Sequence, residues 1–185
     1  MTEPRGIAYT RRVIQIESAD AGFDQALSQL AAFGDAIAVN VVDPARSAPI
    51  VLSEVHLRQA VAAAPGRLEV DTIPMTTFLE VMRLKLSELD RQGSALRGTL
   101  RSDYVEDAMA AIQPLLRQLD QIMFLVSAYA IQRPDERIGP AAAGLTSGRA
   151  AIVRAVETRD NVCGMDALHY EMTPAVRQLA LVFTP

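Results

Sequence analysis

The sequence is poor in cysteine, histidine and tryptophan: it has one cysteine, two histidines and no tryptophan, so few residues could supply thiol or imidazole chemistry. A single cysteine cannot close an intramolecular disulfide, and the charged N-terminus MTEPRGIAYTRR is not followed by the apolar region of a signal peptide. We therefore expect a cytoplasmic protein. The longest nearly uncharged apolar run, residues 122–131, is about half of the ~20 residues that span a bilayer as a helix, so no membrane insertion is expected.

Lysine is nearly absent as well. Lys85 is the only one, against 17 arginines and 22 acidic residues, and the net charge is −4. The two signs are interspersed along the chain and form no basic stripe of the kind that attracts nucleic acids or anionic membranes. The charge pattern therefore argues against nucleic acid as a partner.

Apolar residues make up 50% of the chain, and most are alanine, leucine, valine, isoleucine and methionine, which favours helices over strands. Two apolar 3-4 repeats follow each other after Pro74 and predict long helices that fold back as an antiparallel hairpin over 74–132. The first repeat is Leu79, Met82, Leu86, Leu89, Gly93, Leu96 and Leu100, and the second is Val105, Met109, Ile112, Leu116, Leu119, Met123, Val126 and Ala130.

Before this hairpin, the sequence predicts a further helix from about residue 20 to Val42, because its apolar residues recur at alternating spacings of four and three. Ser53 is expected to cap a shorter helix. Residues 67–73 alternate well enough to form a brief extended segment. The apolar positions of the first of these helices are Phe23, Leu27, Leu30, Gly34, Ile37 and Val41.

These patterns together predict an all-α fold, a helical bundle built on the long antiparallel hairpin, with a short N-terminal strand or arm. Glycine, alanine and proline without apolar periodicity indicate a connector before the last helices. The expected divisions are an arm or short strand at 1–17, the helical bundle at 18–135, the connector at 136–148 and a C-terminal helical subregion at 149–185.

The rare residues of the chain gather in VCGMDALHYEM, residues 162–172. On a helix, Asp166 and His169 are three positions apart and share a face, which resembles half of a dinuclear carboxylate metal site. The other half is missing, so these two residues are only weak candidates for metal ligands. Cys163 would need His169 as its base and a glycine-rich oxyanion loop, and no such loop pattern is present. We predict no catalytic residues, no metal and no cofactor.

Two other polar features have ordinary structural explanations. His56 lacks the flanking lysine and glycines expected of a phosphoacceptor histidine, and it lies near the Ser53 cap. The sequence GLTSGR at 144–149 has the chemistry of an anion site but not the sequence of a P-loop, and Thr146 or Ser147 is expected to cap a helix there.

The main functional hypothesis is a non-enzymatic interaction or assembly protein, an adaptor or scaffold, that binds a protein partner and forms a homodimer through its heptad-patterned helices. A first alternative is a dimeric transcription regulator whose C-terminal segment is a degenerate helix-turn-helix, with its last helix starting at Thr173. Arginines and acids balance in that segment, whereas a DNA-reading unit is basic on one face. A second alternative is a helical bundle that binds a metal or small ligand.

Overall fold

The computed structural model describes residues 8–17, 21–42, 49–63, 66–101 and 105–184, without the side chains of 105–109 and 111. The chain divides into two compact units. The first consists of Met1–Phe78 with Phe124–Pro134, and the second of Leu79–Met123 with Asp135–Pro185. Within the described residues, no helix combines the length and the apolar character needed to span a bilayer.

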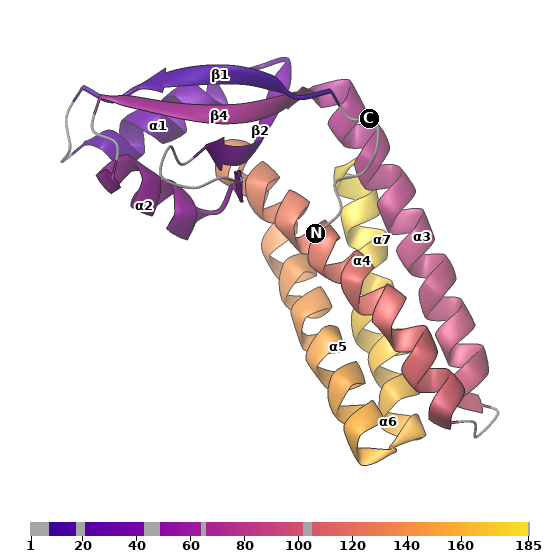
Figure 1. Ribbon diagram of the computed structural model, residues 1–185. Helices are drawn as coiled ribbons and strands as arrows, with labels where there is room; N and C mark the ends of the chain where they lie inside the picture. The colour runs from indigo at the N-terminus through magenta and orange to yellow at the C-terminus, as the bar shows by residue number, and fades with distance from the viewer. Residues whose placement is uncertain (1–7, 18–20, 43–48, 64–65, 102–104, 185) are drawn as a thin grey trace. The chain divides into compact units, whose positions relative to one another are not determined.

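The first unit contains a four-stranded antiparallel sheet with the strand order β1-β4-β2-β3 (Figure 1). The central pair has Ile37 opposite Ile73, and the edge strand β1 has Arg11 opposite Asp71. The pairing of β2 with β4 shifts register between Ala38 and Asn40. The elements in chain order are β1 (Thr10–Gln15), α1 (Gly22–Ala31), β2 (Ala36–Val42), β3 (Ile50–Val51), α2 (Glu54–Ala63) and β4 (Arg67–Pro74).

This sheet overturns the predicted all-α fold. The segment from about residue 20 to Val42 is not one helix, because α1 ends at Ala31 and the chain then enters β2. Strand β2 has the sequence AIAVNVV and is buried on both faces at most positions. A strand buried on both faces is a continuous apolar run, which periodicity alone cannot distinguish from part of a buried helix.

Other expectations in this region are confirmed. Strand β4 covers the extended segment predicted at 67–73, and α2 follows Ser53, whose Oγ accepts a hydrogen bond of 3.2 Å from the His56 amide. Strand β1 lies within the arm or short strand expected at 1–17, of which residues 1–7 lie outside the described residues.

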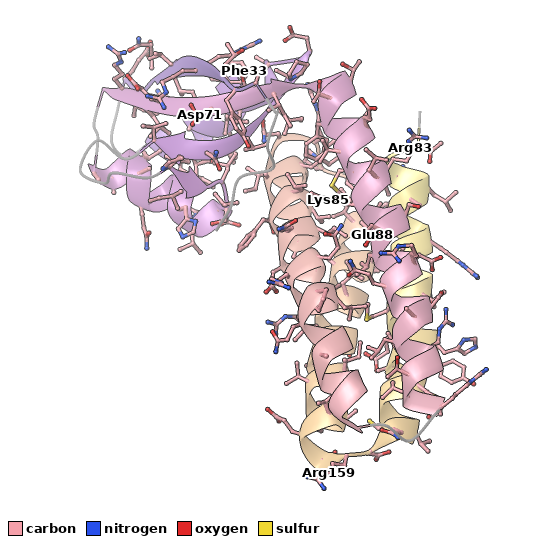
Figure 2. All side chains as sticks on the ribbon, turned by 45° about the vertical axis from the view of Figure 1, so that its right-hand side comes forward. Phe33, Asp71, Arg83, Lys85, Glu88 and Arg159 are labelled. Carbon is pink, nitrogen blue, oxygen red and sulfur yellow. The ribbon has the colours of Figure 1, made fainter. Side chains whose placement is uncertain are left out.

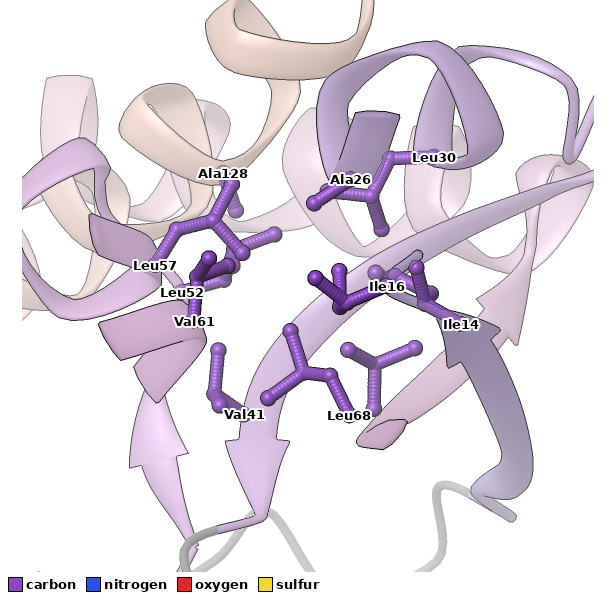
Figure 3. Close-up of a cluster of buried hydrophobic side chains, with 12 residues drawn as sticks. Ile14, Ile16, Ala26, Leu30, Val41, Leu52, Leu57, Val61, Leu68 and Ala128 are labelled. Atoms are coloured by element: carbon purple, nitrogen blue, oxygen red, sulfur yellow. The ribbon is translucent and has the colours of Figure 1, made fainter. Parts of the chain in front are cut away.

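The core of the first unit lies between one face of the sheet and helices α1 and α2 (Figure 3). Alternate residues of a strand face the same side, so Ile14 of β1 points into this core with Leu68 and Val70 of β4, and Ile16, just after β1, joins them. Helices α1 and α2 each add two buried side chains about one turn apart. These are Ala26 and Leu30 from α1 and Leu57 and Val61 from α2, joined by Ala128.

The second unit is helical. Helices α3 (Met75–Arg101) and α4 (Val105–Gln132) supply residues to both units, and α5 (Ile138–Thr158) belongs to the second. The stretch expected as a connector at 136–148 is therefore mostly helix, and Thr146 and Ser147 lie inside α5 instead of capping it. The chain ends with α6 (Asn161–Asp166), a π-helical segment η1 (Ala167–Met172) and α7 (Thr173–Val182).

The C-terminal segment lacks the local structure of a helix-turn-helix. Asn161–Val182 is helical throughout, because η1 follows α6 directly and α7 follows η1. Thr173 begins α7 as expected, but no turn separates it from the preceding helical residues. The degenerate helix-turn-helix interpretation requires such a turn.

Most of the apolar repeat of α3 is buried within the chain. Its positions from Met82 to Leu100 are buried, as are Ile112, Leu119 and Val126 of the repeat in α4. A heptad stripe already covered by its own chain offers little surface to another molecule. The sequence suggested self-association through these positions. Their burial argues against it.

Candidate interaction site at the edge of the sheet

The outer edge of β1 carries the best-defined binding chemistry among the described residues. In an antiparallel pair, successive residues direct their backbone N–H and C=O alternately toward and away from the partner strand. The Ile16 amide donates to the Gly66 carbonyl at 3.1 Å, so Ile14 and Arg12 also direct their polar groups toward β4. Arg11, Val13 and Gln15 then direct theirs away from the sheet.

Glutamine side chains from α1 close one end of this edge. The Gln29 amide copies the pairing of a neighbouring strand, because its Oε1 accepts from the Gln15 N–H at 3.1 Å while its Nε2 donates to the Gln15 carbonyl at 2.6 Å. One turn earlier, Gln25 Oε1 accepts from the Glu17 N–H at 2.9 Å. Backbone groups at Gln15 and Glu17 are therefore satisfied without another strand.

The other end of the edge is open. Within the described residues, no backbone or side-chain group pairs with the outward N–H and C=O of Arg11 or Val13. The Val13 side chain is 38% exposed, and Tyr9 beyond it is 37% exposed. An uncovered row of strand donors and acceptors is a template for pairing with another extended chain.

The charges beside this edge are balanced. Arg11 Nε donates to Asp71 Oδ1 at 3.1 Å, and its guanidinium lies 3.6 Å from Glu69. The hydrogen bond to Asp71, followed by the charge of Asp71, raises the pKa of Arg11. Arg12 lies 3.4 Å from Asp35 and stacks over the Phe33 ring at 4.9 Å. Figure 2 labels Asp71 and Phe33 in the first unit.

A third glutamine, Gln132, caps backbone groups at the opposite edge of the sheet. Strand β3 pairs only with Asn40 and Val41 of β2, which leaves Ala38 beyond its end. Gln132 fills this gap, because its Oε1 accepts from the Ala38 N–H at 2.9 Å and its Nε2 donates to the Ala38 carbonyl at 2.8 Å. Gln132 is 2% exposed, so it supplies hydrogen bonds that water cannot.

The sequence-predicted metal candidates do not form a site. Asp166 ends α6 and His169 lies in η1, where a π-helical turn joins residues five apart, so positions three apart do not stack as in an α-helix. Both are exposed, and no contact joins them among the described residues. The His169 ring instead meets the Tyr170 ring edge-on at 4.6 Å. No group of three or more His, Cys, Asp or Glu that could hold a metal occurs there.

The remaining candidates have structural roles. Asp160 caps α6 by accepting from the Cys163 amide at 2.9 Å, and the Cys163 side chain is partly buried. His56 is half-buried, and its Nδ1 lies 2.8 Å from the Val51 carbonyl oxygen. Among the described residues, no hydrogen bond joins Cys163 to His169.

The second unit carries a groove of about 280 Å³ between α3 and α7. Its polar residues are exposed, and its floor is apolar, so it is a surface depression and not an enclosed ligand pocket. The lining residues are Arg83, Leu86, Ser87 and Asp90 from α3 and Val176, Arg177, Ala180, Phe183 and Thr184 from the C-terminal segment.

Sequence reasoning missed the glutamine contacts. The sequence predicted a short strand or arm at 1–17 but did not indicate which of its backbone groups would be capped. Nothing in the sequence signals that the side chain of a glutamine on a helix will hydrogen-bond the backbone of a strand. The partner of such a side chain depends on tertiary structure.

Comparisons of the chain with protein-family models, with curated proteins and with solved structures gave no significant match. The chain is therefore characterised by its own geometry. It combines an antiparallel sheet, whose edges are partly closed by glutamines, with a helical unit whose apolar repeats are buried.

Proposed function

We propose that this chain is a non-enzymatic interaction protein that takes up an extended backbone segment at the open part of its β1 edge. The observation that carries the proposal is the contrast along one strand. Gln15 is capped by Gln29, whereas the outward backbone groups of Arg11 and Val13 have no partner among the described residues. Proteins bind peptides in this way when main-chain hydrogen bonds supply affinity and alternate side chains supply specificity.

This proposal keeps the interaction role suggested by the sequence but moves the contact surface from the helices to the sheet. Each backbone hydrogen bond contributes about 0.5–1.5 kcal/mol net, and covering the exposed Val13 side chain adds roughly another 1 kcal/mol. Part of this gain is lost in ordering the incoming segment. A short edge of this kind favours a reversible interaction over a permanent complex.

Selection of peptides from a random library on the full chain tests strand uptake. The enriched peptides should have alternating apolar residues, and they should slow hydrogen exchange at the Arg11 and Val13 amides but not at the capped Gln15 amide. If bound peptides protect no amide of β1, strand uptake is wrong.

The Val13→Pro variant is the discriminating control. Because the Val13 N–H points away from β4, proline removes the outward donor without breaking a hydrogen bond inside the sheet. Peptide binding should fall, while the melting temperature should change little. Val13→Ala retains the N–H and should lose only the part of the affinity that comes from the side chain. Equal binding to wild type and Val13→Pro would contradict the proposal.

A further inference from the structure

We propose that the strand received at this edge is β1 of a second copy of the same chain, so that the protein forms a twofold-symmetric dimer through an antiparallel β1–β1 pair. The assignment rests on the strand uptake proposed above and adds the identity of the strand. Charge balance, strand direction and the placement of exposed apolar side chains support it.

Charge balance makes the edge compatible with its own copy. Like charges directly opposite each other destabilise a sheet, and β1 contains two consecutive arginines. Arg11 is held by Asp71 and Glu69, and Arg12 is paired with Asp35. Each copy therefore brings the counter-charges for its own arginines. An acidic peptide from another protein would find these guanidinium groups already paired.

Strand direction and register also fit a second copy. Every pairing in the sheet is antiparallel, and a β1–β1 pair continues this arrangement across a twofold axis. With the axis at Arg11, the two Arg11 residues lie opposite each other, each with its own Asp71 and Glu69 as counter-charges. Val13 of one copy then lies opposite the partner's Tyr9. These are the two exposed apolar side chains near the edge, at 38% and 37% exposure. An aromatic side chain opposite a β-branched one is a favourable cross-strand pair.

The glutamine caps set the length of the interface. Pairing of a second copy with the outward backbone groups of Gln15 would require it to displace both hydrogen bonds that Gln29 makes with them. Because the same cap is present in each copy, the ladder ends symmetrically on both sides of Arg11. An interface this short predicts a dimer that dissociates on dilution, with a dissociation constant of roughly micromolar order.

The oligomeric state of the full chain as a function of concentration is the first test. Sedimentation equilibrium and native mass spectrometry should give a monomer–dimer equilibrium. Val13→Pro should raise the dissociation constant at least about tenfold, because each dimer loses one N–H donor from each copy and each lost bond weakens association about fivefold. Val13→Ala should have a smaller effect.

A disulfide test locates the twofold axis. In a Cys163→Ser background, which removes the only native thiol, Arg11→Cys should form an intermolecular disulfide under mild oxidation. Directly opposite residues have Cα atoms about 4.5–5.5 Å apart, which is within disulfide range. Gln15→Cys is the matched control, since Gln15 is also exposed on the same face of β1 but lies away from the axis. Gln15→Cys should form little disulfide-linked dimer.

The results of these experiments distinguish a failure of β1 self-pairing from a failure of the proposed strand uptake. A chain that stays monomeric to high micromolar concentration, yet still binds peptides in a Val13-dependent way, would overturn self-pairing and leave strand uptake intact. Loss of both behaviours would reject the edge as a binding site. A dimer that is unaffected by Val13→Pro, or that crosslinks as readily through Gln15→Cys as through Arg11→Cys, would also overturn β1 self-pairing.

Discussion

The two units of this chain satisfy their backbone and pack their apolar side chains in different ways. In the sheet unit, glutamine side chains hydrogen-bond backbone groups that no strand pairs, at Gln15 on the outer edge of β1 and at Ala38 beyond the end of β3. In the helical unit, backbone groups are paired inside helices, and close approach depends on glycine, as at Gly148 of α5 against Met172. The comparison indicates that the first unit is sensitive to lost polar caps and the second to added volume.

The largest expected loss of stability comes from removing the buried cap of the sheet. Gln132→Met keeps the approximate size of the side chain but leaves the N–H and C=O of Ala38 without partners in a site that water does not reach. An unsatisfied buried group costs about 1–3 kcal/mol, so the free energy of unfolding should fall by roughly 2–5 kcal/mol. Chemical denaturation measures this change, and a loss below about 1 kcal/mol would contradict the role of Gln132.

Added volume should be the corresponding weakness of the helical unit. A Cβ at Gly148 would lie 2.6 Å from Met172 Cγ and 3.4 Å from the Met172 amide nitrogen. Gly148→Ala should therefore destabilise the protein by about 1–3 kcal/mol, measured by thermal or urea unfolding.

Gly98→Ala is the matched control for this prediction. Gly98 is also inside a helix, but a Cβ there has nothing within 4 Å. Alanine should therefore stabilise α3 by up to about 1 kcal/mol, because it has the better helix propensity. Equal effects of the two substitutions would show that helix propensity, and not close packing, determines the outcome at Gly148.

An exposed cap should matter much less than a buried one. Gln29→Met removes both hydrogen bonds to Gln15, but these lie at the surface, where water can replace them. The free energy of unfolding should fall by less than about 1 kcal/mol. The same variant should lengthen the open edge and strengthen dimerisation, which sedimentation equilibrium would detect. Weaker dimerisation of Gln29→Met would contradict the cap as the boundary of the interface.

The sequence predicted several elements of this fold but not its class, for reasons visible in particular residues. Strand β4 alternates, and its extended conformation was predicted correctly. Strand β2 is apolar at every position except Asn40, and such a run fits a buried helix as well as a buried strand. The pattern could not show that β2 pairs with β4, which is distant from it in the sequence.

Glycine and proline misled the prediction of the connector at 136–148. Pro140 lies in the first turn of α5, where proline is tolerated, and Gly144 and Gly148 allow close packing inside the same helix. At the candidate edge, a short strand or arm was expected at 1–17, and β1 lies within that range. The caps at Gln15 and Ala38 were not expected, because they depend on where helices lie relative to strand ends.

The smallest effect expected in this comparison is the response of the helical unit to acid. Hydrogen bonds from Arg91 and then from Gln92 lower the pKa of Glu88 from its ordinary value of 4.5 to about 2. Figure 2 labels Glu88 on α3. A carboxylate with a lowered pKa stabilises the folded state above the unfolded value and loses that contribution as pH falls from about 4.5 toward 2. Because Glu88 and Arg91 are at the surface, the contribution should be small and weakened by salt.

Glu88→Gln should therefore flatten the dependence of unfolding free energy on pH below about 4.5, while leaving the neutral-pH fold intact. Glu80→Gln is the matched control, since Glu80 is exposed on the same helix and forms no ion pair among the described residues. Denaturant titrations from neutral to acid pH distinguish the two variants. An acid response of Glu88→Gln equal to that of wild type would mean that the Arg91 contact is not kept in solution. This ion pair would then contribute little to the helical unit, and close packing such as that at Gly148 would be the larger of the two effects.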